Sequence, residues 1–152
     1  VFCDVEFFGT VRQGLDELVV PPETPIRNFS HYLVYANSSL AEQSLPAEHE
    51  IFDMNASASD IRFQDQDLDE TEIGGQIYWL PPFDSSRVQD YILTLALSPT
   101  GMARSQVGPS LPVGNETQAL DPETVIAEEA YVVVYTRSAL AEQTTPVDLK
   151  IV

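Results

Sequence analysis

The chain has 152 residues, with 24 acidic side chains against 7 basic ones, so its formal net charge is −17 and its pI is near 4.1. This much negative charge repels phosphate and argues against nucleic acids and anionic membrane surfaces as partners. Hydrophobic residues make up 43% of the chain, enough for a packed core, and no apolar run approaches the roughly 18 residues of a membrane helix. The 11 prolines and 7 glycines favour an all-β protein.

The chain begins with Val1 rather than Met, and we expect it to be a processed or excerpted piece of a longer protein. Its single cysteine, Cys3, excludes a disulfide within the chain and a thiolate metal cluster. Two interpretations of Cys3 stay open. It is either a buried, inert thiol or the partner of a cysteine upstream or in another chain.

Strand patterns follow one another along the chain. Residues 73–80 alternate around Trp79 and stop at two prolines, residues 91–97 form an apolar run that ends in a turn, residues 131–135 are β-branched or aromatic, and residues 149–152 close the pattern. Turn signals are frequent and sustained helical periodicity is missing, so the sequence predicts an antiparallel β-sandwich. The only helical candidate, Ser38 to Gln43, is too short to be more than a turn. The side chains expected between the two sheets are Trp79, Tyr91, Leu93, Leu95, Val132 and Val134, with Tyr131 near a sheet end.

An internal repeat organises these patterns. When the sequence is laid over itself with an offset of 100, about a third of the positions from Gly14 onward are identical without a gap. The runs 22–24 and 40–43 return letter for letter as 122–124 and 140–143. A repeat of about 100 residues suits a sandwich domain and is too long for a helical solenoid unit. We therefore expect the C-terminal part of one repeat over residues 1–53, a linker over 54–60, and a nearly complete second repeat over 61–152.

Two of these segments carry a resemblance to a known family. Residues 77–82, followed by Asp84 and residues 88–93, resemble the Trp-x-Pro-Pro…Val-x-x-Tyr pattern of fibronectin type III domains. The resemblance implies tandem immunoglobulin-like sandwiches in a large extracellular repeat protein, with Trp79 in the core and Tyr131 as the tyrosine of a corner motif. Residues 31–38 resemble the same sixth strand of the family, although His31 stands at the position of Tyr131. The Leu-Ala-Glu-Gln-x-x-Pro tail departs from the family's usual Gly-x-Ser, which indicates a divergent branch.

Asparagine usage points to the secretory pathway. The chain has four asparagines, and each begins an Asn-x-Ser/Thr acceptor sequence: Asn28, Asn37, Asn55 and Asn115. All four fall at predicted turns or loops, where a bulky N-linked glycan is accommodated. We expect an extracellular or cell-surface location.

An acidic run lies where the two repeats meet. Asp65, Asp67 and Asp69 imitate the start of an EF-hand loop, but Glu70 replaces the required Gly and Gln76 the required Glu, so an EF-hand is rejected. Two interpretations remain. The three aspartates bind calcium together with Asp53 or a backbone carbonyl of the preceding repeat, or the run is a solvated, self-repelling connector.

The expected function is non-catalytic, because no convergent set of catalytic side chains is found in the sequence. We expect a structural or adhesive segment of an extracellular glycoprotein, in a filament, matrix or surface array, whose partners are other repeats of the parent chain or further subunits, with no membrane insertion by this segment. One alternative is a carbohydrate- or protein-binding module of a larger surface enzyme, with an exposed aromatic patch around Tyr78, Phe83 and Tyr91. Another is a receptor ectodomain. The first repeat is completed either by upstream residues or by strands from a neighbouring subunit.

Overall fold

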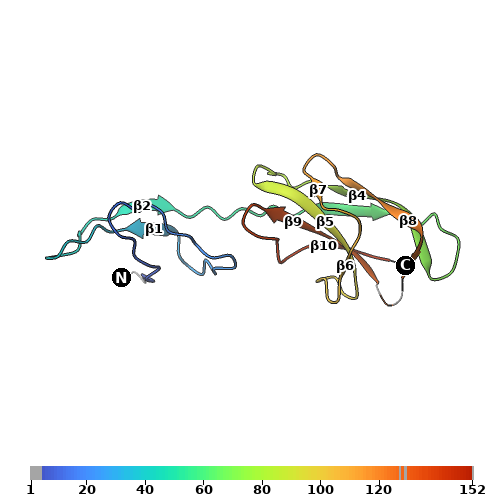
Figure 1. Ribbon diagram of the computed structural model, residues 1–152, viewed down its shortest axis with the longest axis horizontal. Helices are drawn as coiled ribbons and strands as arrows, with labels where there is room; N and C mark the ends of the chain where they lie inside the picture. The colour runs from blue at the N-terminus through green and yellow to red at the C-terminus, as the bar shows by residue number, and fades with distance from the viewer. Residues whose placement is uncertain (1–4, 127, 129, 152) are drawn as a thin grey trace. The chain divides into compact units, whose positions relative to one another are not determined.

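The computed structural model describes residues 5–126, 128 and 130–151, and these form two compact units, Val1–Phe52 and Asp53–Val152 (Figure 1). Cys3 lies outside the described residues. The boundary falls ahead of the segment 54–60 that was expected as a linker. Ala58 is buried in the core of unit 2, and a strand begins at Ser59, so the end of that segment belongs to the second unit.

Unit 2 consists of antiparallel strands in two sheets. One sheet has the order β3-β4-β8, with β3 at Ser59–Phe63, β4 at Glu72–Leu80 and β8 at Thr117–Val125. The other has the order β10-β9-β5-β6, and β7 also pairs with β5; its strands are β5 (Val88–Ala96), β6 (Ser105–Gln106), β7 (Leu111–Pro112), β9 (Tyr131–Ser138) and β10 (Val147–Lys150). No helix occurs among the described residues, so none of them forms a helix that is long and apolar enough to cross a membrane.

The core of unit 2 lies between these two sheets. Ile77 and Trp79 of β4 and Leu120 of β8 belong to one buried cluster with side chains of the facing sheet. All six residues expected in the core are buried: Trp79, Tyr91, Leu93, Leu95, Val132 and Val134. Two sheets that bury one shared apolar layer make a β-sandwich, so the predicted all-β, antiparallel class is confirmed. Trp79 and Tyr91 pack edge to face, with ring centroids 5.4 Å apart.

The outer face of the β5–β9 sheet carries a smaller cluster of Ile92, Ala96, Val133 and Tyr135. The Tyr135 hydroxyl donates a hydrogen bond to the carbonyl of Thr100 at 3.3 Å, and the Arg104 guanidinium lies 4.2 Å from the centre of its ring. These contacts tie the turn that follows β5 to β9. Tyr131 begins β9 and is half-buried, as expected for a residue near a sheet end.

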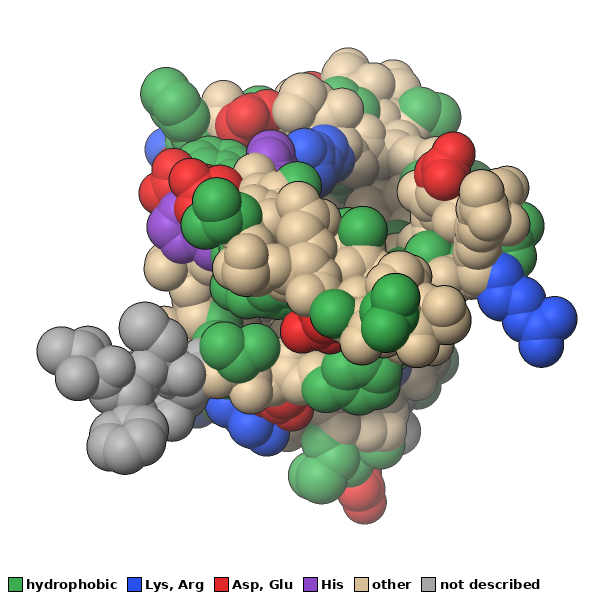
Figure 2. All heavy atoms as spheres, turned by 90° about the vertical axis from the view of Figure 1, so that its left-hand side faces the viewer, with side chains coloured by type: hydrophobic (Ala, Val, Ile, Leu, Met, Phe, Trp, Pro, Cys, Tyr) green, Lys and Arg blue, Asp and Glu red, His purple; other side chains and the backbone are tan. Residues whose placement is uncertain are grey.

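The described residues of unit 1 contain one antiparallel hairpin, formed by β1 (His31–Val34) and β2 (Ala47–Glu50). Its register pairs Val34 with Ala47, and the hairpin of β9 and β10 pairs Val134 with Val147, which is the same pair moved by 100 residues. Every other pair of β1 and β2 has its counterpart in unit 2 at the same offset. Figure 2 looks onto this unit, which carries both histidines of the chain, and shows hydrophobic side chains at the surface among acidic ones.

The loop inside each hairpin also repeats. The Ser38 hydroxyl donates a hydrogen bond to the carbonyl of Ala41, and Ser138 does the same to Ala141. The segment from Ser38 to Gln43, the one helical candidate in the sequence, forms no helix. An isolated bridge between Asn37 and Glu42 closes this turn instead, and the Ser38 side chain satisfies backbone groups of the turn.

Candidate functional sites

The acidic loop between β3 and β4 is shaped by its own carboxylates. One oxygen of Asp65 accepts hydrogen bonds from the backbone N–H of Asp67 at 3.0 Å and of Gly74 at 2.9 Å. One oxygen of Asp67 accepts from the N–H of Asp69 at 3.1 Å. Aspartates that accept from the amide two residues ahead form Asx-turns, so the alternate spacing folds the loop into successive tight turns.

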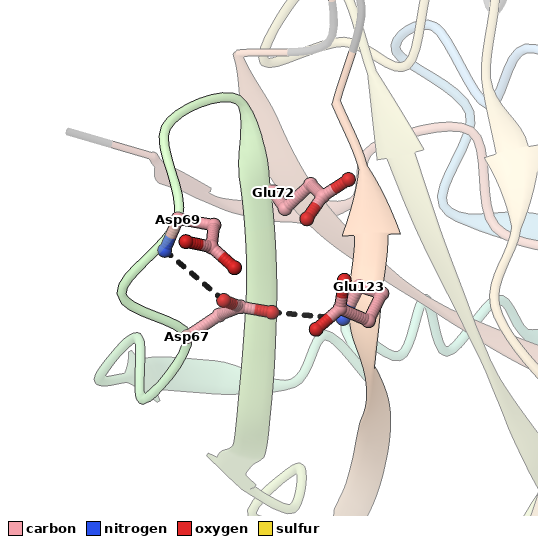
Figure 3. Close-up of side chains that lie close together, drawn as sticks. All are labelled: Asp67, Asp69, Glu72 and Glu123. Carbon is pink, nitrogen blue, oxygen red and sulfur yellow. Dashed lines mark hydrogen bonds between the residues drawn. The ribbon is translucent and has the colours of Figure 1, made fainter.

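The same loop brings four carboxylates together. Asp67, Asp69, Glu72 and Glu123 each offer one oxygen, and these oxygens all lie within 4.8 Å of one another (Figure 3). The second oxygen of Asp67 accepts a hydrogen bond from the N–H of Glu123 at 2.8 Å, which joins the loop to β8. We call these four residues the acidic cluster. Of the three aspartates expected as calcium ligands, Asp67 and Asp69 belong to the cluster and Asp65 does not.

The pKa values of the cluster show how its charges are arranged. Hydrogen bonds from the backbone N–H groups of Glu123 and Asp69 hold the pKa of Asp67 below its ordinary value. Desolvation raises the pKa of Glu72, and the negative charges of Glu123, Asp67 and Asp69 raise it further. Asp67 is therefore the carboxylate whose charge is best accommodated, whereas the charge of Glu72 is disfavoured by its neighbours.

The acidic cluster lies at the end of unit 2 where β10 ends. Residues 53–58 lead into the start of β3, and the loop follows the end of β3, so this strand separates Asp53 from the cluster. Glu72 pairs with Val125 at the start of β4, and Lys150 pairs with Tyr131 at the end of β10. The cluster and residue 151 therefore share one end of the unit (Figure 1).

Glu72 belongs to the acidic run of the sequence but is not among the expected calcium ligands, and the sequence pattern missed Glu123 altogether. Glu123 has a positive φ of 63°, and Glu23, its counterpart at the offset of 100, has a φ of 61°. In both turns the threonine that follows donates from its hydroxyl, Thr24 to Pro21 and Thr124 to Asp121. A left-handed conformation is unfavourable for a glutamate. The repeated Pro-Glu-Thr sequence is thus a signal for a turn with a left-handed glutamate. It does not indicate which carboxylates lie beside Glu123.

The four glycosylation sequences all lie at the surface. Asn28, Asn37, Asn55 and Asn115 are exposed, in turns or between strands. Asn55 is held by its own sequence, because its side-chain oxygen accepts hydrogen bonds from the N–H of Ser57 at 3.2 Å and from the hydroxyl of Ser57 at 2.7 Å. Exposure is the requirement that a glycan imposes on its asparagine, and the four sites meet it.

The aromatic patch suggested for a binding module does not form as expected. Tyr78 and Phe83 are exposed, but Tyr91 is fully buried in the core. Alternation along β5 directs Tyr91 inward toward Trp79. Two exposed aromatic residues remain of the three.

The chain matches no family model, no curated protein and no solved structure. Its functional interpretation therefore rests on the residues and the geometry described above.

Proposed function

We propose that this chain is a non-catalytic, structural or adhesive segment of an extracellular or cell-surface glycoprotein built from tandem fibronectin type III-like domains. The observation that carries the proposal is the hairpin that occurs twice, with one register and one loop geometry at an offset of 100 residues. Tandem copies of one domain are suited to act as spacers or as assembly surfaces. Partners are then further repeats of the same kind, on the parent chain or on other subunits.

The fibronectin type III-like assignment is supported by the position of its key residues. Trp79 lies on β4 and packs against Tyr91 of the facing sheet, as the resemblance implies for the second and third strands of the family. The family pattern favours Tyr131 for the corner hydrogen bond. On β9 the hydroxyl of Tyr135, four residues further along, donates a hydrogen bond to the carbonyl of Thr100. This difference fits a divergent branch of the family.

The extracellular location is supported by the four exposed acceptor asparagines, since they are all the asparagines of the chain. We expect at least two of them to carry a glycan in protein from its native source. Peptide mass spectrometry before and after treatment with peptide N-glycosidase tests this, because release of the sugar converts each occupied Asn to Asp. Four unmodified asparagines would remove the argument for secretion and leave the repeat architecture untouched.

The acidic cluster supports calcium as an accessory of this architecture. Its oxygens come from carboxylates, which calcium prefers, and a divalent cation relieves the repulsion that raises the pKa of Glu72. Because the cluster lies at the end of unit 2 that holds residue 151, it would stiffen that end of the domain. The segment 53–58 is at the other end of β3.

Calcium binding is tested by melting the full chain with calcium and with chelator, and the unfolding midpoint should be higher with calcium. Glu123→Gln should abolish the difference, whereas the matched change Glu116→Gln, outside the cluster, should preserve it. Equal midpoints with calcium and chelator would identify the cluster as a solvated acidic loop.

A further inference from the structure

A groove lies on unit 2 beside the acceptor sequence of Asn115. Tyr78 and Leu80, at alternate positions of β4, are 52% and 53% exposed, whereas Trp79 between them is buried in the core. The groove has a volume of about 590 Å³, and its lining includes Asp60, Arg62, Tyr78, Leu80, Asn115 and Thr117. This volume falls in the range of small-ligand sites, about 300–1,000 Å³. An aromatic and an aliphatic side chain therefore line a groove that is large enough for a small ligand.

Asn115 is fixed beside this groove by a turn. Its backbone N–H donates a hydrogen bond to the carbonyl of Pro112 at 3.1 Å, and its side-chain amide donates to the same carbonyl at 3.2 Å. The side-chain amide of an asparagine carries two N–H hydrogens, and attachment of a glycan replaces one of them. The bond to Pro112 uses the other hydrogen, so the side chain can keep this orientation when it carries a sugar.

The threonine of the same acceptor sequence is anchored to β4. Thr117 pairs with Tyr78 in the register of β8 against β4. The Thr117 hydroxyl donates a hydrogen bond to the carbonyl of Ile77 at 3.1 Å and accepts one from the side-chain amide of Gln76 at 2.5 Å. Directly opposed residues of two strands have Cβ atoms about 4.5–5.5 Å apart. The acceptor sequence is therefore held against Tyr78.

The side chains of the groove suit a neutral sugar. A pyranose ring has a face of C–H groups that packs on an aromatic ring, and polar groups around its rim that need hydrogen-bond partners. Tyr78 and Leu80 offer the apolar surface, and the ion-paired side chains of Asp60 and Arg62 offer acceptors and donors beside it. A sugar tethered to Asn115 needs little intrinsic affinity, because the attachment gives it a high effective concentration at the groove.

We propose that this groove holds the first N-acetylglucosamine of a glycan attached to Asn115, with the sugar ring packed on Tyr78. The glycan then covers the exposed apolar side chains of β4 and becomes part of the surface of unit 2. This inference rests on the proposed function only for the presence of a glycan at Asn115. It does not depend on the repeat architecture, on the fibronectin type III-like assignment or on calcium.

The test uses the full chain secreted from eukaryotic cells with high-mannose glycans. Peptide mass spectrometry first measures the occupancy of Asn115. Endoglycosidase H, which cuts between the first and second sugars, then acts on the folded protein. A first sugar held in the groove shields this bond, so cleavage at Asn115 should be at least threefold faster in Tyr78→Ala than in the wild type. Phe83→Ala removes an exposed ring that does not line the groove, and this matched control should leave the rate unchanged.

Melting temperatures give a second, independent measurement. The wild type, Tyr78→Ala, Asn115→Gln and the double variant are compared as a double-mutant cycle. A contact of the strength of an aromatic pair corresponds to about 2–6 °C in a domain of this size. Tyr78→Ala should lower the melting temperature by that amount in the glycosylated chain and by less than about 1 °C in the Asn115→Gln background. A role of Tyr78 in the protein fold alone would give equal losses in the two backgrounds.

The results that would overturn this proposal are distinct from those that would overturn the proposed function. With Asn115 occupied, equal cleavage rates for the wild type and Tyr78→Ala, or equal losses of melting temperature in the two backgrounds, would overturn the sugar-binding groove and leave the extracellular location in place. An unoccupied Asn115 in a chain that carries glycans at its other acceptor asparagines would do the same. Four unoccupied asparagines would overturn both the groove and the argument for secretion.

Discussion

Replacing Trp79 by alanine tests the sandwich core most directly. Trp79 is 3% exposed in the layer between the sheets and contacts Tyr91 edge to face. Truncation of a large core aromatic costs about 3–5 kcal/mol of unfolding free energy, of which an edge-to-face pair accounts for about 0.5–1.5 kcal/mol. The indole N–H of Trp79 has no hydrogen-bond partner in the described part of the chain. Removing an unsatisfied group recovers part of the loss, so we expect a value near the lower end, about 3 kcal/mol.

Urea unfolding followed by far-ultraviolet circular dichroism measures this cost, since the substitution removes the only tryptophan. The transition reports mainly on unit 2, because an isolated two-stranded hairpin such as that of unit 1 is marginally stable. Phe83→Ala is the matched control: this ring is fully exposed, and its loss should change the unfolding free energy by less than about 0.5 kcal/mol. If Trp79→Ala cost less than about 1 kcal/mol, the two-sheet core would be refuted.

Two further predictions concern a turn and the acidic cluster. Gly101 has a φ of +80°, and a Cβ there would lie 1.7 Å from the Tyr135 hydroxyl, so Gly101→Ala should lower the melting temperature more than Gly114→Ala, whose φ is +98° in open space. If both variants lost the same amount of melting temperature, the packing of Tyr135 against residue 101 would not contribute to stability. The pKa of Glu72 is raised, so the folded state binds the carboxyl proton more tightly than the unfolded chain does. Glu72 therefore makes folding less favourable as the pH rises from 4.5, its ordinary pKa, through the raised pKa of the folded state. Glu72→Gln should therefore raise the melting temperature at pH 7 and reduce the loss of melting temperature as the pH rises just above 4.5. If the variant had the same dependence of melting temperature on pH as the wild type, the clustering of these carboxylates would be contradicted.

The strands with strong alternation could be predicted from the sequence, and those that depend on their neighbours could not. The expected strand at 73–80 is β4, and the run at 131–135 lies in β9. The sequence does not predict β3: its first two residues fall in the expected linker, two of its five residues are charged, and pairing with β4 orders it. β8 contains Asp121, Pro122 and Glu123, which read as a loop. Pairing with β4 overrides this local preference, with a shift of register between Ile73 and Gly75.

The candidate sites show the same division between local and long-range information. The exposure of the four asparagines was predictable, because turns lie at the surface and each acceptor sequence falls in or beside one. The acidic cluster was predictable in its loop residues Asp67 and Asp69 and not in Glu123, which lies 56 residues beyond Asp67 along the chain. The register of β4 against β8 brings these residues together, and spacing along the sequence does not encode that register.

The two copies of the repeat show which strands form from local sequence and which need a partner strand. The hairpin of β1 and β2 forms with the register of its counterpart because both strands and their loop are present, and the contacts of that loop are local. The counterpart of β8 in unit 1, residues 17–25, has a similar sequence and forms no strand, since the strand that pairs with β8, β4, has no counterpart in residues 1–52 under the offset of 100. Similar sequences therefore give a strand in one unit and irregular chain in the other according to whether a partner is present.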